Sequence, residues 1–150
     1  MPASILVTGG TSPVASFSSV NVSNSVINRY AGATLSGFGG ATSTSIVDVS
    51  APQTLSGSAS VFGVRTAADV TGGTLNIDSS SNLQMGGLII NGAGSAAPVI
   101  GSNLVFAQAG QAGTVMPEAL VYVSGGYTSG TATVSGDVTS GVLTKFGPGD

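Results

Sequence analysis

Two aspartates are the residues whose type and spacing come closest to a catalytic pair. Asp48 lies in an alternating stretch, and Asp69 follows it 21 positions later. If the chain winds in loops of that length, the two carboxyl groups would stack about 5 Å apart, as in a retaining glycosidase. Such clefts also use aromatic platforms and basic sugar-clamping residues, and only Arg65 is near in the sequence. We therefore expect solvated acids, with Arg65 pairing with Asp69, and no enzyme.

The sequence offers little to hold a cofactor or a metal ion. The opening residues 5–15, ILVTGGTSPVA, look like the glycine-rich turn of the short-chain dehydrogenases. However, Ser12 and Ala15 replace the later glycines, Pro13 intervenes, and no helical pattern follows to receive a pyrophosphate. There is no Cys, and the calcium-binding pattern G-G-x-G-x-D is absent. We predict a β-turn between strands at this point, no cofactor and no metal site.

Hydroxyl and aromatic side chains raise two binding hypotheses. Ice-binding solenoids order water on several regular T-x-T rungs, but only two unrelated T-x-T pairs occur here, at 42–44 and 131–133. Neutral hydroxyl and amide rows can also bind glycans, with Tyr30, Tyr122 or Tyr127 as candidate stacking surfaces. The plainer interpretation is that Ser and Thr solubilise β-strands.

The composition excludes two classes of partner. Charged residues make up 6% of the chain, with a net charge of −3, against about 25% in an average soluble domain. The basic residues Arg29, Arg65 and Lys145 are scattered singly, so we expect no nucleic-acid partner. The mean hydropathy is +0.45, yet the apolar runs are far shorter than the roughly 18 to 20 residues that span a bilayer. We expect no membrane-spanning segment, and residues 1–4 lack the features of a signal peptide.

Short stretches of period two dominate the chain, and helix signals are nearly absent. In residues 73–78, Leu75 and Ile77 point to one face while the polar residues between them point to the other. Gly-Gly pairs separate such stretches, and good helix formers are sparse. This pattern predicts an all-β fold with one dry and one wet face to each strand.

Short internal repeats suggest how those strands are arranged. The segments ATLSG, QTLSG and GTLNI place Thr-Leu pairs 20 residues apart, and SNLQM and SNLVF recur after 21. We interpret residues 1–150 as one β-solenoid segment of roughly seven coils of about 20–21 residues, stacked about 4.8 Å apart. An antiparallel sandwich is the competing architecture. The predicted core ladder consists of Leu35, Leu55, Leu75, Leu83 and Leu104, and Thr34, Thr54 and Thr74 would form an outer row.

The C-terminal residues 135–149, SGDVTSGVLTKFGPG, resemble the autotransporter-associated β-strand repeat, whose core reads G-L-T-K-x-G-x-G-T-L. The matching positions are Leu143, Thr144, Lys145, Gly147 and Gly149. The resemblance implies a right-handed parallel β-helix, exported and displayed outside the cell, and it carries no catalytic residue. Asp150 stands where the family continues with T-L-x-L-x-G.

These observations lead to one expectation about function. We expect a non-enzymatic stalk or passenger segment of a secreted or cell-surface bacterial protein, as a fragment of a longer repetitive chain. A solenoid presents unpaired strand edges at both ends, so we expect either further repeats of the parent chain or end-to-end stacking into fibres. An adhesin or glycan-binding module for surface glycans is the first alternative, and a polysaccharide-degrading enzyme is the second, less favoured one.

Overall fold

In the computed structural model the described residues are 5–8, 14–21, 26–29, 34–78, 86–92, 94–107 and 118–150, and over the first three ranges only the backbone is described. All regular elements among these residues are β-strands, which confirms the predicted all-β class. None of these residues belongs to a helix of the length and apolarity that a bilayer crossing requires.

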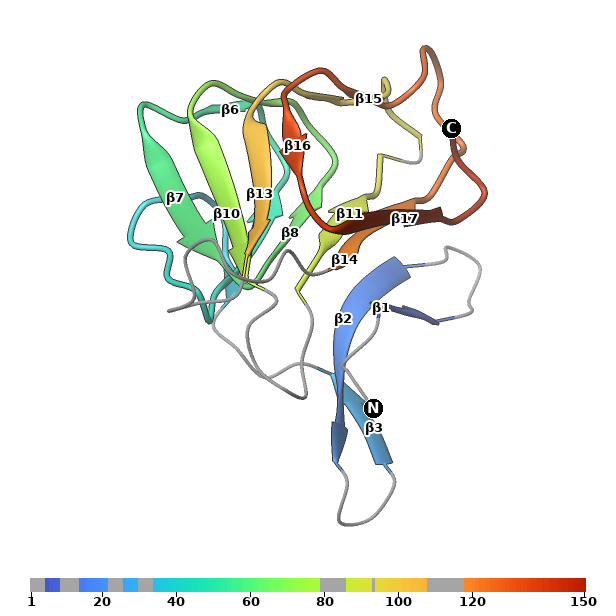
Figure 1. Cartoon of the computed structure of the whole chain (residues 1–150). Coiled ribbons are helices and arrows are strands. Elements are labelled where there is room, and N and C mark those ends of the chain that lie inside the picture. Colours follow the sequence, from blue (N-terminus) through green and yellow to red (C-terminus); the bar gives the residue numbers. More distant parts are fainter. Residues whose placement is uncertain are drawn as a thin grey trace.

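Fourteen strands, β4 to β17, form three parallel sheets (Figure 1). The six-stranded sheet contains, in order, β4 (Thr34–Leu35), β5 (Ile46–Val49), β8 (Gly63–Thr66), β11 (Leu88–Ile90), β14 (Glu118–Val123) and β17 (Val142–Phe146). The β7–β16 sheet contains β7 (Ser58–Val61), β10 (Thr74–Asp78), β13 (Asn103–Ala107) and β16 (Val138–Thr139). The β6–β15 sheet contains β6 (Gln53–Thr54), β9 (Val70–Thr71), β12 (Val99–Ile100) and β15 (Thr133–Val134).

The chain visits the three sheets in a fixed order. From β5 to β16, each strand of the six-stranded sheet is followed by one of the β6–β15 sheet and then one of the β7–β16 sheet. Each strand from β8 onward therefore lies beside the strand three elements earlier in the sequence, as β7, β10, β13 and β16 show from green to red (Figure 1). Stacked parallel sheets of this kind are compatible with a β-solenoid, and they exclude the antiparallel sandwich for the described residues from 34 onward.

The N-terminal strands differ from the rest. β1 (Ile5–Thr8), β2 (Val14–Asn21) and β3 (Val26–Arg29) form a separate antiparallel sheet in the order β1-β2-β3. The pairing of Ile5 with Phe17 shows that the chain reverses between β1 and β2. Residues 9–13, where the β-turn is predicted, lie outside the described residues. The strands on either side of them are antiparallel neighbours, whereas a dinucleotide-binding turn leads from a strand into a helix.

The register corrects the predicted period. Val47 pairs with Val64, 17 positions later, whereas Val64 pairs with Leu88 after 24 and Leu88 with Val121 after 33. The steps are unequal because the connections between strands differ in length while the strands keep their pairing. A constant coil of 20–21 residues is therefore wrong for this part of the chain.

The predicted leucine ladder is wrong for the same reason. Leu35 lies in the six-stranded sheet and pairs with Val47, Leu55 directly follows β6, and Leu75 lies in the β7–β16 sheet. One predicted pair of leucines does stack, since Leu75 pairs directly with Leu104. Leu83 lies outside the described residues. The three copies of the Thr-Leu motif therefore belong to strands of three different sheets and do not stack on one another.

The core consists of aliphatic columns that run across the sheets. In the six-stranded sheet one column joins Leu35, Val47, Val64, Leu88, Val121 and Lys145 in direct register. In the β7–β16 sheet Leu75 and Leu104 occupy another column, and both are almost fully buried. Each such side chain contributes about 1.5–3 kcal/mol when it leaves water, so the columns hold the sheets together despite the sparse surface charge.

Candidate functional site

The two candidate acids do not form a pair. Asp48 lies in β5, where Arg65 of the neighbouring strand donates to it from Nε over 3.1 Å and completes the ion pair through Nη2. This hydrogen bond raises the pKa of Arg65. Asp69 precedes β9 in another sheet, and its Oδ1 accepts the backbone N–H of Val99 at 2.8 Å. Both carboxylates are therefore engaged structurally, and the expected pairing of Arg65 with Asp69 is wrong.

Other polar groups join neighbouring strands in the same way. Glu118 accepts a hydrogen bond from the hydroxyl of Thr144, which joins β14 to β17. Asn103 Oδ1 accepts the backbone N–H of Asp137 at 3.1 Å. In the part of the chain that the structure describes, no three acidic residues gather in a group that could hold a metal ion.

Tyr122, a candidate glycan contact, belongs to a second apolar cluster on the outer face of the six-stranded sheet. Its side chain is 4% exposed and meets Phe146 edge to face, with ring centroids 5.5 Å apart. Ile89, fully buried, occupies the same outward row, while its neighbours Leu88 and Ile90 face the core. The outer face of this sheet is thus dry here, which leaves little of the Tyr122 ring for a sugar to stack against.

Tyr127, another candidate glycan contact, is half-buried and packs against the core cluster, and the third candidate, Tyr30, lies outside the described residues. A Cβ on Gly92 would lie 2.9 Å from the Tyr127 ring, so the absence of a side chain at Gly92 makes room for it. Burial raises the pKa of Tyr127. The residue also lines a small open cavity of about 230 Å³, bordered mainly by glycine backbone.

The glycines of the C-terminal motif have a clear physical role. Gly147 has φ +97°, and a Cβ there would lie 2.2 Å from the carbonyl oxygen of Val123. A Cβ on Gly149 would lie 2.4 Å from the backbone nitrogen of Gly125. The turn after β17 therefore approaches the turn after β14 more closely than any side chain allows. These glycines permit backbone-to-backbone stacking.

The other motif residues alternate between the two faces of β17. Leu143 pairs with Ala119 and Lys145 with Val121, and both partners belong to the core cluster, so Leu143 and Lys145 point inward. Thr144 points outward, toward Glu118. Since β17 lies last in its sheet, none of the described strands covers the two inward side chains.

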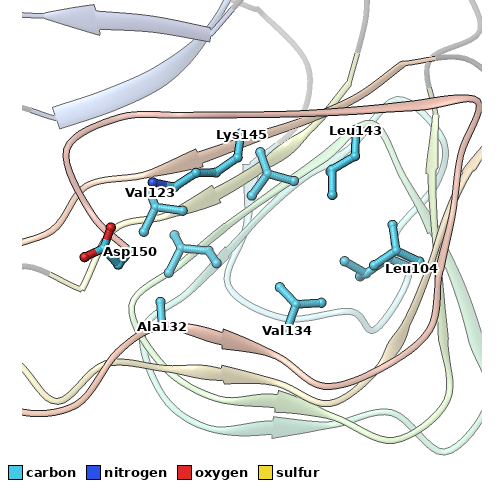
Figure 2. Close-up of a pocket in the computed structure, with 10 residues that line it drawn as sticks. Leu104, Val123, Ala132, Val134, Leu143, Lys145 and Asp150 are labelled. Carbon is cyan, nitrogen blue, oxygen red and sulfur yellow. The ribbon is translucent and has the colours of Figure 1, made fainter.

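The open end of the core is the cavity above these inward side chains, and Figure 2 shows its lining. It has a volume of about 270 Å³. Val134, Val138 and Leu143 form its apolar rim and are 37%, 39% and 56% exposed. Lys145 and Asp150 contribute the only charged side chains among the ten residues that line it.

The covered end of the core lies at the other extreme of the sheets and consists of residues 34–45. Leu35, Phe38 and Ala41 of this segment are partly buried and pack against the core cluster. A Cβ on Gly37 would lie 3.4 Å from Oε1 of Gln53, so the segment passes close to that inward-facing side chain. Residues 34–45 contain no charged residue.

The open end also presents free backbone edges. β15, β16 and β17 each lie last in their sheets, so one edge of each strand has no neighbour among the described strands. Sequence reasoning anticipated unpaired edges at both ends. At the covered end β6 and β7 likewise lie last in their sheets, while Leu35, Phe38 and Ala41 pack against the core cluster.

Comparison with models of known protein families, with curated proteins and with solved structures gave no match to this chain.

Proposed function

We propose that this chain is a non-enzymatic structural segment, a stalk or passenger, of a secreted or cell-surface bacterial protein. The observation that carries this proposal is the unbroken parallel pairing of the six strands of the six-stranded sheet, from β4 at one edge to β17 at the other. Columns of side chains in direct register make each strand depend on its two neighbours, as in repeat proteins whose stability is a sum of nearest-neighbour terms. Such a body is suited to extending or spacing other parts of a protein.

The handedness that goes with this proposal is right-handed. Each return from one strand to its parallel neighbour in the same sheet is a crossover, and such crossovers are right-handed in about 98% of cases. Together with the fixed visiting order of the three sheets, this preference supports a right-handed parallel β-helix in which each triplet of strands is one coil.

The location outside the cell rests on the resemblance to the autotransporter-associated repeat. The role of Gly147 and Gly149 in close stacking gives the motif a physical reason in this chain. Labelling intact cells of the producing bacterium with an antibody against this chain tests the location. Staining only after the cells are broken would contradict it.

Limited proteolysis tests the structural role. A protease that cuts at apolar residues should cleave residues 46–78 of the native protein far more slowly than in urea, because the aliphatic side chains there lie in the columns. The Leu75→Ala variant is the internal control and should be cut faster. Equal rates in buffer and in urea would contradict a stiff, resistant segment.

A second experiment tests the alternative function, that of an adhesin or glycan-binding module. A glycan array with the intact protein should give no reproducible binding. Reproducible binding that is lost in the Tyr127→Ala variant would replace the spacer role with a glycan-binding one.

A further inference from the structure

We propose that the outer face of the six-stranded sheet is a docking surface within this chain, and that its occupant is the N-terminal sheet of β1, β2 and β3. The inference goes beyond the structural role proposed above, because it concerns the side of the body and not its stacked columns. It gives the N-terminal sheet, which pairs with none of the parallel strands, a place in the molecule.

The outward row of this face changes character from one side of the sheet to the other. On β5, β8, β11, β14 and β17 the row reads, in direct register, Asp48, Arg65, Ile89, Tyr122 and Phe146. The first two residues are charged and paired with each other. The last three are apolar or aromatic and form the apolar outer row. This row, on β11, β14 and β17, is the part of the face that needs a cover.

The apolar outer row is covered in the folded chain. Ile89 is 0% exposed and Tyr122 is 4% exposed, although both side chains lie outside the core cluster. The inward side chains of all three parallel sheets meet in that one core cluster, so none of these fourteen strands lies over the outer face. Among the strands that the structure describes, β1, β2 and β3 remain to cover it.

Both views place the N-terminal sheet on this side of the molecule. In Figure 2, strands of the N-terminal sheet, drawn in pale blue, lie on the side of β17 that faces away from the cavity. In Figure 1, the blue strands β1 and β2 lie beside β14 and β17, outside the three parallel sheets. Two sheets that pack face to face lie about 10 Å apart, with the side chains of both faces between them.

The pairing of β1 with β2 gives the N-terminal sheet one apolar face. Ile5 pairs with Phe17, and Val7 pairs with Ala15. Residues directly opposite each other lie on one face of a sheet, and so do residues two apart along a strand. These four positions therefore share a face, while Ser16 stands on the opposite one. An apolar face of this kind matches the apolar outer row.

Each of the two faces is stabilised by the other. A small sheet gains stability when its apolar face packs against another element. The apolar outer row gains in the same way, because burying apolar surface is favourable in rough proportion to its area. Docked there, the N-terminal sheet contacts three successive coils at once, whereas each coil contacts only its own neighbours. The N-terminal sheet therefore braces the side of the body.

Nitration of tyrosines in the intact protein, located by mass spectrometry, tests the proposal. Phe17→Asp places a charge on the apolar face of the N-terminal sheet and should raise the nitration rate of Tyr122 by at least about tenfold, because undocking uncovers its ring. Ser16→Asp, on the same strand but the opposite face, is the matched control and should change that rate by less than about twofold. Tyr127, which packs against the core cluster, is the internal reference and should react equally in all three proteins.

Hydrogen exchange of β2 tests the same contact from the other side. Tyr122→Ala should speed the exchange of the β2 amides, because the N-terminal sheet loses part of the surface on which it rests. Asp48→Asn changes the charged side of the same outward row and should leave the exchange of β2 unchanged. Circular dichroism of each variant separates a detached N-terminal sheet from a body that has unfolded.

Three outcomes would overturn the proposal. A Tyr122 ring that stays unreactive in Phe17→Asp would mean that another part of the chain covers the apolar outer row. Equal nitration of Tyr122 in Phe17→Asp and Ser16→Asp would mean that the docked face is wrongly assigned. Unchanged exchange of β2 in Tyr122→Ala would mean that the N-terminal sheet does not rest on this row. None of these outcomes affects the proteolysis test of the structural role, so the two proposals fail independently.

Discussion

The two ends of the core differ in how far their apolar side chains are shielded from water. At the covered end the chain turns Leu35, Phe38 and Ala41 inward and shows water only neutral groups. At the open end Val134 and Leu143 remain uncovered and a lysine occupies the column. A column of stacked side chains has no natural stop, so each end needs either its own cover or a partner.

Local geometry reinforces this contrast. The covered end closes on itself through short-range hydrogen bonds, such as Ser45 N to the carbonyl of Thr42 at 2.8 Å, and through Gly40 with φ +73°. At the open end, Gly147 and Gly149 let the turn after β17 lie directly against the backbone of Val123 and Gly125 in the turn after β14. Residues 34–45 therefore pack over the core at the covered end, whereas β15, β16 and β17 lie last among the described strands at the open end.

The largest expected effect contrasts a buried column with the open end. Leu75→Ala should lower the free energy of unfolding by about 2–5 kcal/mol, because it leaves a cavity in a fully buried site. Leu143→Ala removes the same atoms where the side chain is half in water, and should cost the monomer less than about 1 kcal/mol. Urea unfolding at low protein concentration measures both. Equal losses would mean that the open end is not open.

The next effect compares the ends directly. Phe38→Asp should destabilise the monomer by about 2–4 kcal/mol, because it removes apolar packing and places a charge against the core. Leu143→Asp should change monomer stability by less than about 1 kcal/mol, since water already reaches that position. A reversed order in thermal unfolding at low protein concentration would show that the assignment of covered and open ends is wrong.

A smaller effect concerns one glycine from each end. Gly147→Ala should cost about 1–3 kcal/mol, because its positive φ and the carbonyl of Val123 both resist a Cβ. Gly39→Ala is the matched control: a Cβ there meets no atom within 4 Å, so the change should stay within about 0.5 kcal/mol. Urea midpoints of the two variants give the comparison, and similar values would contradict the close stacking at the open end.

The smallest effect lies between the ends, at the ion pair of Asp48 and Arg65. A double-mutant cycle with Asp48→Asn and Arg65→Met should give a coupling of at most about 1 kcal/mol, because the Asp48 side chain is 38% exposed and solvent screens it. The coupling should fall further in 1 M salt. A coupling that is several times larger and insensitive to salt would assign this pair a role that the geometry does not support.

The sequence predicts the fold class well and the stacking poorly, for physical reasons. Period-two alternation in residues 73–78 predicts a strand because a half-buried strand needs it whatever its neighbours are. Which strand lies above which depends on the lengths of the connections, and these vary from step to step. The Thr-Leu spacing of 20 therefore misleads, while the true neighbours Leu75 and Leu104 share no repeat with each other.

Some features of the candidate sites could likewise be predicted from the sequence, and others could not. The dry outer face of the six-stranded sheet could have been inferred from Leu88, Ile89 and Ile90, because a strand buried on both faces shows no alternation. The pairing of Asp48 with Arg65 could not, since it needs the 17-residue step between β5 and β8. The contrast between the packed residues Leu35, Phe38 and Ala41 and the exposed Val134 and Leu143 becomes visible only once the strands are placed in their sheets.

The central claim is the register of the stacked strands, and paired cysteines test it most directly. The chain has no Cys, and the hydroxyl oxygens of Thr54 and Thr71 lie 3.2 Å apart on neighbouring strands. Thr54→Cys/Thr71→Cys should therefore oxidise to an intramolecular disulfide with loss of both free thiols, whereas Thr54→Cys/Thr74→Cys, which follows the 20-residue spacing, should keep its thiols under the same oxidant. Cross-linking of the second pair and not of the first would contradict the account.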